Sequence, residues 1–283
     1  MKRTITFLAT AGVMLAAAVP TAGAATETVT SGPVTVTFSY TKTDELTFED
    51  MHLKIVRSDV VGLDVPIASR ACELGCWPGA ELFEDGRSIK VTDLDGDGEP
   101  EILLDLYTGG AHCCIVTEVY ALQGVPAATV VPGYGRVEHN FLDPGYSLAD
   151  LNGDGSPEFR SADGRFAYAL SSYAGSGVPV QIWRFQHGDL EDVTSEFPEL
   201  IRADSKHWWK VYRRNIRRRP PENDPGLGAL AAWAGDEYRL GHAGKVQREL
   251  KLGLRRGWLD GYFGSGRRAV RDLNRLLRQT GYR

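Results

Sequence analysis

Two Asp-rich segments contain the residues whose types and spacing most clearly suggest a chemistry. The first runs from Asp93 to Glu101, with carboxylates at its first, third, fifth and ninth positions and Gly98 at the sixth. Calcium takes 6–8 oxygen ligands at about 2.3–2.6 Å, and this spacing allows one loop to wrap around one ion. We therefore expect a calcium site made by the side chains of Asp93, Asp95, Asp97 and Glu101 and the backbone carbonyl of Glu99.

A close copy of this segment begins 57 residues later, at Asp150. Its expected ligands are Asp150, Asn152, Asp154, the backbone carbonyl of Ser156, and Glu158. The copy has three carboxylates where the first segment has four, so we expect it to bind calcium less tightly. In both loops the Ca²⁺ would be structural and would fix the turn. The alternative is a pair of Asx-rich turns that bind nothing.

Neither segment fits the helix–loop–helix calcium motif. That motif requires a glutamate at position 12 and a helix on each side, whereas position 12 is Leu104 in the first segment and Ser161 in the second. Residues 89–92 and 146–149, which precede the two segments, have strand-like patterns. We therefore expect strand–loop–strand turns.

The two segments resemble the FG-GAP/VCBS-type calcium-binding repeat of integrin-like propellers and secreted bacterial proteins. The resemblance covers about residues 88–190. It implies extracellular, calcium-stabilised propeller sheets used in adhesion or carbohydrate contact. Residues 25–198 have room for about three units of this period, whereas a closed propeller needs at least four blades. Propeller-like sheets that do not close, or a compact sandwich, are therefore expected.

The alternating patterns of residues 34–40 and 51–56 indicate a further sheet unit without an Asp-rich loop. Residues 199–283 instead repeat apolar residues at helical spacing. The expected fold is α+β and multidomain, with mainly-β repeat sheets over residues 27–198 followed by a small all-α bundle over residues 199–283.

The charge balance changes at the same place. Residues 199–283 carry 20 Lys and Arg against 9 Asp and Glu, whereas residues 25–198 carry 10 against 28. The densest basic cluster is a candidate anion-binding site or a solvated helix end, or it could dock on the acidic part of the same chain. It consists of Arg213, Arg214, Arg217, Arg218 and Arg219. No nucleic-acid-binding motif accompanies it.

The N-terminus has the pattern of a cleaved signal peptide over residues 1–24. Lys2 and Arg3 precede an apolar core, and Ala22-Gly23-Ala24 matches a cleavage site. The core is about 15 residues long, which is short for a membrane span. We therefore expect a secreted, extracellular protein without a transmembrane segment.

Four cysteines lie within 43 residues of one another: Cys72, Cys76, Cys113 and Cys114. In an exported chain this count predicts two disulfides. A bond between adjacent cysteines is strained, so the two pairings that join Cys72 and Cys76 to Cys113 and Cys114 are favoured. A zinc site that also uses His112 is the alternative, but adjacent cysteines fit tetrahedral geometry poorly.

No recognised catalytic motif is present, and we assign no catalytic residue. The function expected from these observations is an extracellular binding or interaction module with two structural calcium ions. Its partner would be an anionic cell-surface polymer or a carbohydrate. The alternative is a secreted cell-wall or polysaccharide hydrolase with a pair of carboxylates. Asp105 and Glu118 are candidates for that pair.

Overall fold

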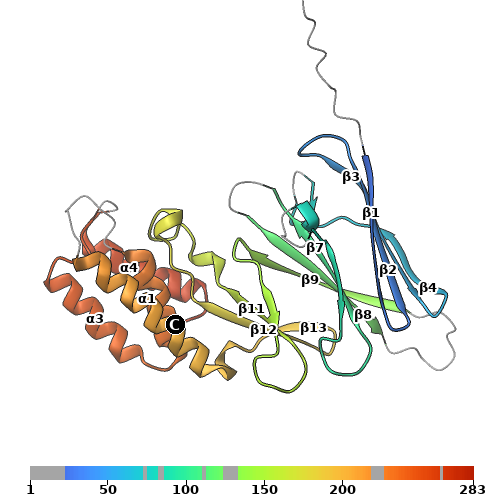
Figure 1. Cartoon of the computed structure of the whole chain (residues 1–283). Helices are drawn as coiled ribbons and strands as arrows, with labels where there is room; N and C mark the ends of the chain where they lie inside the picture. The colour runs from blue at the N-terminus through green and yellow to red at the C-terminus, as the bar shows by residue number, and fades with distance from the viewer. Residues whose placement is uncertain are drawn as a thin grey trace, which may run out of the picture.

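The described part of the protein consists of three antiparallel sheets followed by four helices (Figure 1). The computed structural model describes residues 23–72, 75–81, 86–109, 113–123, 133–217, 226–261 and 264–283. The sheets follow one another in chain order, and the helices form the end of the molecule farthest from the first sheet. The α+β class is thus confirmed, and no closed barrel occurs among the described residues. Most of the predicted signal peptide lies outside them.

The first sheet is a meander of four strands in chain order. Every second residue of its second strand is buried, including Val34, Val36 and Phe38, because alternate side chains of a strand point to opposite faces. The alternation predicted for residues 34–40 and 51–56 is confirmed as two paired strands. The strands are β1 (Gly23–Ser31), β2 (Val34–Lys42), β3 (Phe48–Arg57) and β4 (Val60–Pro66).

The second sheet has five strands and is buried on both faces at its centre. Its central strand β7 is buried at six consecutive positions, so its sequence reads as a continuous apolar run with Asp105 inside it. The sheet order is β5-β7-β8-β9, and β6 pairs with β7 on the same side as β5. The strands are β5 (Trp77–Pro78), β6 (Ile89–Thr92), β7 (Glu101–Tyr107), β8 (Ile115–Gln123) and β9 (Gly133–Leu142).

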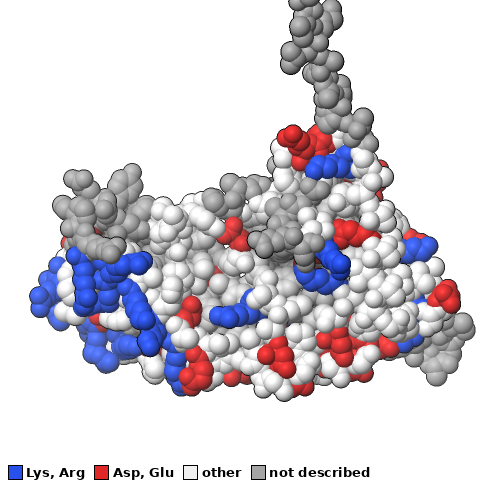
Figure 2. Space-filling view, viewed as in Figure 1, with Lys and Arg blue, Asp and Glu red and all other residues white. Residues whose placement is uncertain are grey.

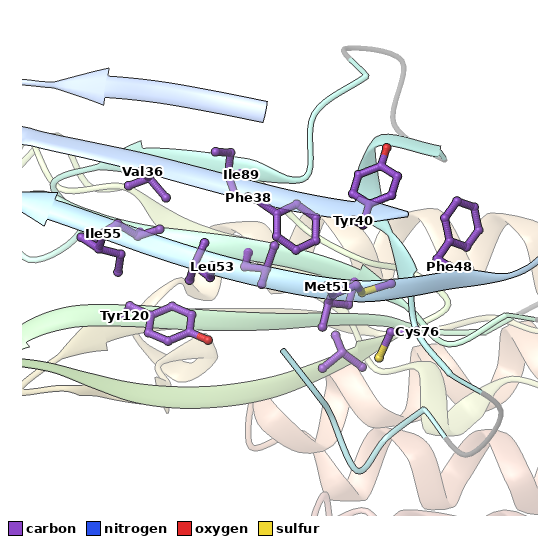
Figure 3. Close-up of a cluster of buried hydrophobic side chains, with 14 of the residues drawn as sticks. Val36, Phe38, Tyr40, Phe48, Met51, Leu53, Ile55, Cys76, Ile89 and Tyr120 are labelled. Atoms are coloured by element: carbon purple, nitrogen blue, oxygen red, sulfur yellow. The ribbon is translucent and has the colours of Figure 1, made fainter. Parts of the chain in front are cut away.

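One hydrophobic core joins the first two sheets. Phe38, Leu53 and Ile55 of the first sheet are completely buried, and they belong to one cluster with Ile89 and Ile102 of the second. Figure 3 shows these side chains of β2 and β3 directed between the two layers. This burial of large apolar side chains fixes the first sheet against the second.

The third sheet packs against the other face of the second. Leu103 and Val119 of the second sheet share a buried cluster with Phe159 and Phe185 of the third. The third sheet is again a four-stranded meander in chain order. Its strands are β10 (Ser147–Ala149), β11 (Glu158–Ala162), β12 (Val180–Gln186) and β13 (Asp189–Asp192).

The helices surround one central helix, α2. Residues 227–237 of α2 are all buried, and most of them are Ala, Gly or Leu, which allow close approach of the neighbouring segments. A Cβ atom added at Gly228 would lie 2.2 Å from the carbonyl oxygen of Gly175, so this helix start tolerates no side chain. The helices are α1 (Pro198–Arg217), α2 (Leu227–Arg239), α3 (Ala243–Arg255) and α4 (Gly266–Gln279).

The helices also pack directly on the third sheet. Ile201 of α1 shares a cluster with Val180 and Ile182 of β12, and Arg239 of α2 pairs with Asp192 of β13 at 2.7 Å. The change from strands to helices falls at residue 198, close to the change in charge balance. The division of the chain into two domains at that point stays a prediction.

The cysteines form two disulfides, but the predicted cross-links are wrong. Cys72 pairs with Cys76, and Cys113 pairs with Cys114. Cys76 precedes β5 and Cys114 precedes β8, and these strands flank β7 on opposite sides. Two strand spacings separate them, about 9–10 Å, which exceeds the Cα–Cα distance of about 7 Å that a disulfide can bridge.

A buried carboxyl group of α2, Asp236, lies near the half-buried Asp204 of α1. Asp236 of α2 is completely buried, and this burial, together with the nearby Asp204, raises the pKa of Asp236 to about 10. Asp204 accepts hydrogen bonds from the Val180 amide at 2.9 Å and the Trp208 indole at 3.1 Å. Burial thus favours the protonated form of Asp236, close to the residue that links α1 to β12.

Replacing Asp236 with Asn should stabilise the protein above neutral pH. The folded-state pKa lies above the ordinary value, so the unfolded state binds fewer protons, and stability falls by up to about 1.4 kcal/mol per pH unit as the pH rises from about 4 to about 10. The amide cannot ionise, so this dependence should disappear. Chemical denaturation of both proteins between pH 5 and pH 9 measures it, and parallel curves would contradict the assignment.

Candidate metal centre

The first Asp-rich loop connects β6 to β7 at the edge of the buried second sheet. Thr92 pairs with Glu101, so residues 93–100 form the connection. Leu94 is completely buried in the cluster between the second and third sheets, which anchors the start of the loop. Gly96 and Gly98 have φ values of +77° and +88°, in the left-handed region that favours glycine. Strand pairing and these two glycines therefore turn the loop back on itself.

The loop's carboxylates bind its own backbone. Asp93 accepts hydrogen bonds from the amides of Gly96 at 2.8 Å and Gly98 at 3.0 Å. Asp97 accepts one from the amide of Glu99 at 2.7 Å, and Glu101 accepts one from the buried amide of Leu94 at 2.7 Å. These bonds direct several carboxylates toward the interior of one short loop.

Three of the predicted ligands come together. One carboxylate oxygen from each of Asp93, Asp95 and Glu101 lies within 4.8 Å of the other two, and this is the one such acidic group in the described part of the chain. Glu101 is 3% exposed. Its burial, and secondarily the charges of Asp95, Asp97 and Asp93, raise the pKa of Glu101 to about 8.

The same physical causes act on Asp95, whose pKa is raised by burial and by Asp97 and Asp93. Carboxylates that resist ionisation because of one another favour a bound cation, which removes the repulsion. The donors are all oxygen atoms, the ligand type that Ca²⁺ prefers. The residues present therefore fit a calcium ion.

Glu99 has a side-chain role that the sequence did not predict. Its carboxylate binds the guanidinium of Arg57, at the end of β3, through contacts of 2.9 Å and 2.5 Å. This ion pair lowers the pKa of Glu99. It also ties the loop to the first sheet. The backbone carbonyl of Glu99, which is the expected calcium ligand, takes no part in this ion pair.

The second Asp-rich loop has the same backbone scheme. It joins β10 to β11, and Ala149 pairs with Glu158 as Thr92 pairs with Glu101. Asp150 accepts hydrogen bonds from the amides of Gly153 at 2.6 Å and Gly155 at 3.0 Å. Glu158 accepts one from the amide of Leu151 at 2.9 Å, and Asp154 accepts one from the amide of Ser156 at 2.8 Å.

The side-chain environment of the second loop is nevertheless different. Arg184 of β12 contacts Glu158 Oε1 at 3.2 Å. The amide nitrogen of Asn152 donates to the same oxygen at 3.1 Å and to Asp154 at 2.7 Å. A guanidinium and an amide thus satisfy the carboxylates that the sequence assigned to a second calcium ion.

Strand register explains why the first loop has no such cation. Phe159 pairs with Trp183, so Arg184 lies opposite Glu158. Ile102 pairs with Tyr120 in the second sheet, so the position opposite Glu101 is Ala121. Arg184 was not among the site residues predicted from the sequence, because its place opposite Glu158 follows from the strand register.

The two loops lie side by side at one end of the paired sheets. A Cβ atom added at Gly96 would lie 2.7 Å from the hydroxyl oxygen of Ser156. Ser156 was expected to act through its carbonyl in the second calcium site. Its hydroxyl lies close to Gly96 of the first loop, so the two turns are neighbours. The role of the Ser156 carbonyl stays a prediction.

The carboxylates proposed for a hydrolase are internal groups of the sheets. Asp105 is completely buried and is bonded by Lys90 at 2.7 Å and Thr117 at 2.6 Å. Glu118 is equally buried and is bonded by Tyr120 at 2.5 Å and Arg136 at 2.7 Å. Both side chains stabilise strand pairing, and neither is exposed to a substrate.

The predicted anion-binding cluster lies at the end of α1. Arg213 stacks between Trp209 and Trp258, with centroid distances of 5.6 Å and 5.5 Å. Arg214 and Arg217 are exposed. Arg218 and Arg219 lie outside the described residues. The structure therefore gives one of these arginines a packing role and leaves two of them on the surface.

Comparison with known proteins gives two relatives. A probable thylakoid lumen protein of Synechocystis is 34% identical over 157 residues, covering 54% of this chain and 44% of that protein. An uncharacterized protein of Sinorhizobium fredii is 31% identical over 171 residues, covering 58% of this chain and 25% of that protein. The chain thus spans less than half of either relative.

No family of known proteins matches the chain, and no solved structure matches it. The resemblance to FG-GAP/VCBS repeats therefore stays a prediction. None of the described helices is long and apolar enough to cross a membrane.

Replacing Glu101 with Gln should stabilise the protein in a chelator. The raised folded-state pKa means that the metal-free protein loses stability as the pH rises from about 4.5 to about 8, and an amide removes this loss. We expect a gain of about 1 kcal/mol or more at pH 8 and none at pH 4.5. Thermal unfolding in EDTA measures the effect.

Glu158→Gln is the matched control for this experiment. It removes a carboxylate that is bound to Arg184, so it should lower stability by about 1–2 kcal/mol under the same conditions. Changes of the same sign in the two variants would mean that Arg184 does not distinguish the two loops.

Proposed function

We propose that this protein is an exported calcium-binding protein in which one Ca²⁺ fixes the turn between β6 and β7. The observation that supports this most directly is the grouping of Asp93, Asp95 and buried Glu101, with no cation of the chain at the position opposite Glu101. Asp97 and the Glu99 carbonyl would complete the ligand set. The role of the ion is structural.

Calcium at this turn would act on the packing of all three sheets. Glu101 begins the central strand β7, and Leu94 of the loop packs against the third sheet. Arg57 ties the loop to the first sheet through Glu99. An ion that neutralises the loop therefore stabilises the contacts around it as well as its own turn.

The second predicted calcium site is a weaker proposal. Arg184 and Asn152 donate to the oxygens that would face an ion there. A calcium ion would have to displace both groups and leave Arg184 beside a second positive charge. We therefore propose one tight calcium site, at the first loop. The second loop is a turn that Arg184 and Asn152 of the chain itself stabilise.

An exported location is supported by the signal-peptide pattern of residues 1–24 and by the relative named as a thylakoid lumen protein. Free calcium outside the cytosol is sufficient for sites of moderate affinity. The two disulfides agree with an oxidising compartment. Within that compartment, we propose that the protein acts as a binding or interaction module. We also propose that its three sheets are arranged like blades of a propeller that does not close.

Calcium should raise the thermal stability of residues 25–283 relative to EDTA. A ligand that binds only the native state adds about 2.7 kcal/mol at one hundred times its Kd. Titration calorimetry should give one ion per chain. Asp95→Ala should lose this response, whereas Asn152→Ala should retain it. Equal loss in both variants, or no bound calcium in the wild type, would contradict the single site.

An exchange of cations between the two loops gives a sharper test. Ala121→Arg places a guanidinium opposite Glu101, so it should stabilise the protein in EDTA by up to about 1 kcal/mol and abolish the calcium response. Arg184→Ala should destabilise the metal-free protein and make its second loop respond to calcium. Circular dichroism checks that both variants are folded. Retention of full calcium binding by Ala121→Arg would overturn the assigned position of the ion.

A further inference from the structure

Helix α4 exposes a row of arginines on the side away from the helical core. Its buried residues are Gly266, Ala269, Leu273 and Leu277, which face the other helices. Its basic residues are all exposed, and each lies three or four positions from another of them, so they follow one face of the helix. They are Arg267, Arg268, Arg271, Arg275 and Arg278.

A single carboxylate lies within this row. Asp272 contacts Arg275 at 2.6 Å and Arg268 at 3.6 Å, so it holds two guanidinium groups beside each other. Within the described part of the chain, Arg267, Arg271 and Arg278 make no side-chain ion pair or hydrogen bond. The row therefore has five positive charges and one negative charge, and most of its donors are available to a partner.

The arginines line two adjoining hollows. One, of about 580 Å³, is open and lies among side chains of α4 alone: Arg268, Arg271, Asp272, Asn274, Arg275 and Arg278. The other, of about 510 Å³, shares Arg268, Asp272 and Arg275 with it and extends to Arg165 and Leu170 beside the third sheet. We call these two adjoining hollows the α4 groove; its wall outside the helix, at Arg165 and Leu170, belongs to the second hollow. This surface is distinct from the metal centre and does not depend on it.

We propose that this groove binds a linear polymer that carries phosphate groups. Every basic residue of α4 is Arg, whose planar group matches phosphate oxygens through paired hydrogen bonds better than the ammonium of Lys. From Arg268 to Arg278 the row is about 15 Å long, at 1.5 Å per residue. A chain with repeated anionic groups can contact the row at several points, whereas a single phosphate contacts one or two arginines.

A membrane surface fits this groove less well. Helices that bind at a lipid interface bury an apolar face among the lipid chains. The apolar face of α4 is already covered by the other helices, and the large hydrophobic residues exposed in the described structure include none from α4. A groove between α4 and the segment around Arg165 also fits a linear polymer better than it fits the flat surface of a membrane.

The α4 row is a stronger candidate than the cluster predicted at the end of α1. Arg213 of that cluster is held between two indole rings, which leaves Arg214 and Arg217 as its exposed described arginines. Figure 2 shows that Lys and Arg gather over the helical end of one face of the molecule, while most acidic residues on that face lie over the sheets. The acidic sheets would repel a polyanion, so the helical end is where it would bind.

The test measures binding of long-chain inorganic polyphosphate to the folded protein by titration calorimetry. Arg268→Gln, Arg271→Gln, Arg275→Gln and Arg278→Gln together should weaken binding at least about tenfold and make it less dependent on salt. The matched control replaces with Gln three exposed basic residues of α3 and the one that follows the helix: Arg248, Lys251, Arg255 and Arg256. It should weaken binding less than about threefold. Equal weakening in the two variants would show that net charge alone binds the polymer, and would overturn the proposal.

Two further binding experiments, with lipid vesicles and with an oligonucleotide, distinguish the class of partner. Vesicles that contain phosphatidylglycerol should bind weakly, and tight binding to them through the α4 arginines with no binding of polyphosphate would overturn the choice of polymer. A single-stranded oligonucleotide bound more tightly than polyphosphate would do the same. Circular dichroism checks folding. If the fourfold variant is unfolded, the pair Arg271→Gln and Arg278→Gln, which breaks no ion pair, replaces it and should weaken binding at least about threefold.

Discussion

A buried carboxylate at the start of β7 is the constraint on which the middle of this protein depends. Glu101 must be inside because the strand that it begins is covered on both faces. A carboxylate in that position needs a proton or a cation beside it. The contacts that surround it link its loop to the first sheet through Arg57 and to the third through Leu94. The charge state of one side chain is therefore coupled to the packing of three sheets.

The same constraint occurs again at Glu158, which is 1% exposed. There Arg184 supplies the positive charge beside the carboxylate. Arg184 also binds Glu196 at 2.8 Å. The two turns share loop length, glycine conformation and backbone hydrogen bonds. On our proposal they differ in the source of positive charge, Arg184 at the second loop and a calcium ion at the first, so similar sequences would depend differently on the solvent.

The parts that were predictable from sequence are those with a local cause. Period-two patterns located β2 and β3, and the Asp and Gly spacing located both turns. Contacts between residues that are far apart in the sequence could not be predicted in this way. The disulfide pairing depended on β5 and β8 lying on opposite sides of β7, and the role of Arg184 depended on strand register. The arginines of α4 are regularly spaced in the sequence, but their exposure follows from which side of α4 the other helices cover.

The pairing of Arg184 with Glu158 has a consequence for how the protein responds to its surroundings. A cation attached to the chain has an effective concentration that neither dilution nor a chelator changes. A free ion at the first loop follows the composition of the medium. On our proposal, the protein therefore combines one permanent counter-ion with one exchangeable counter-ion at neighbouring turns. The packing between the second and third sheets would then change with the ionic composition outside the cell membrane at the first loop. At the second loop, where Arg184 supplies the charge, it would stay the same.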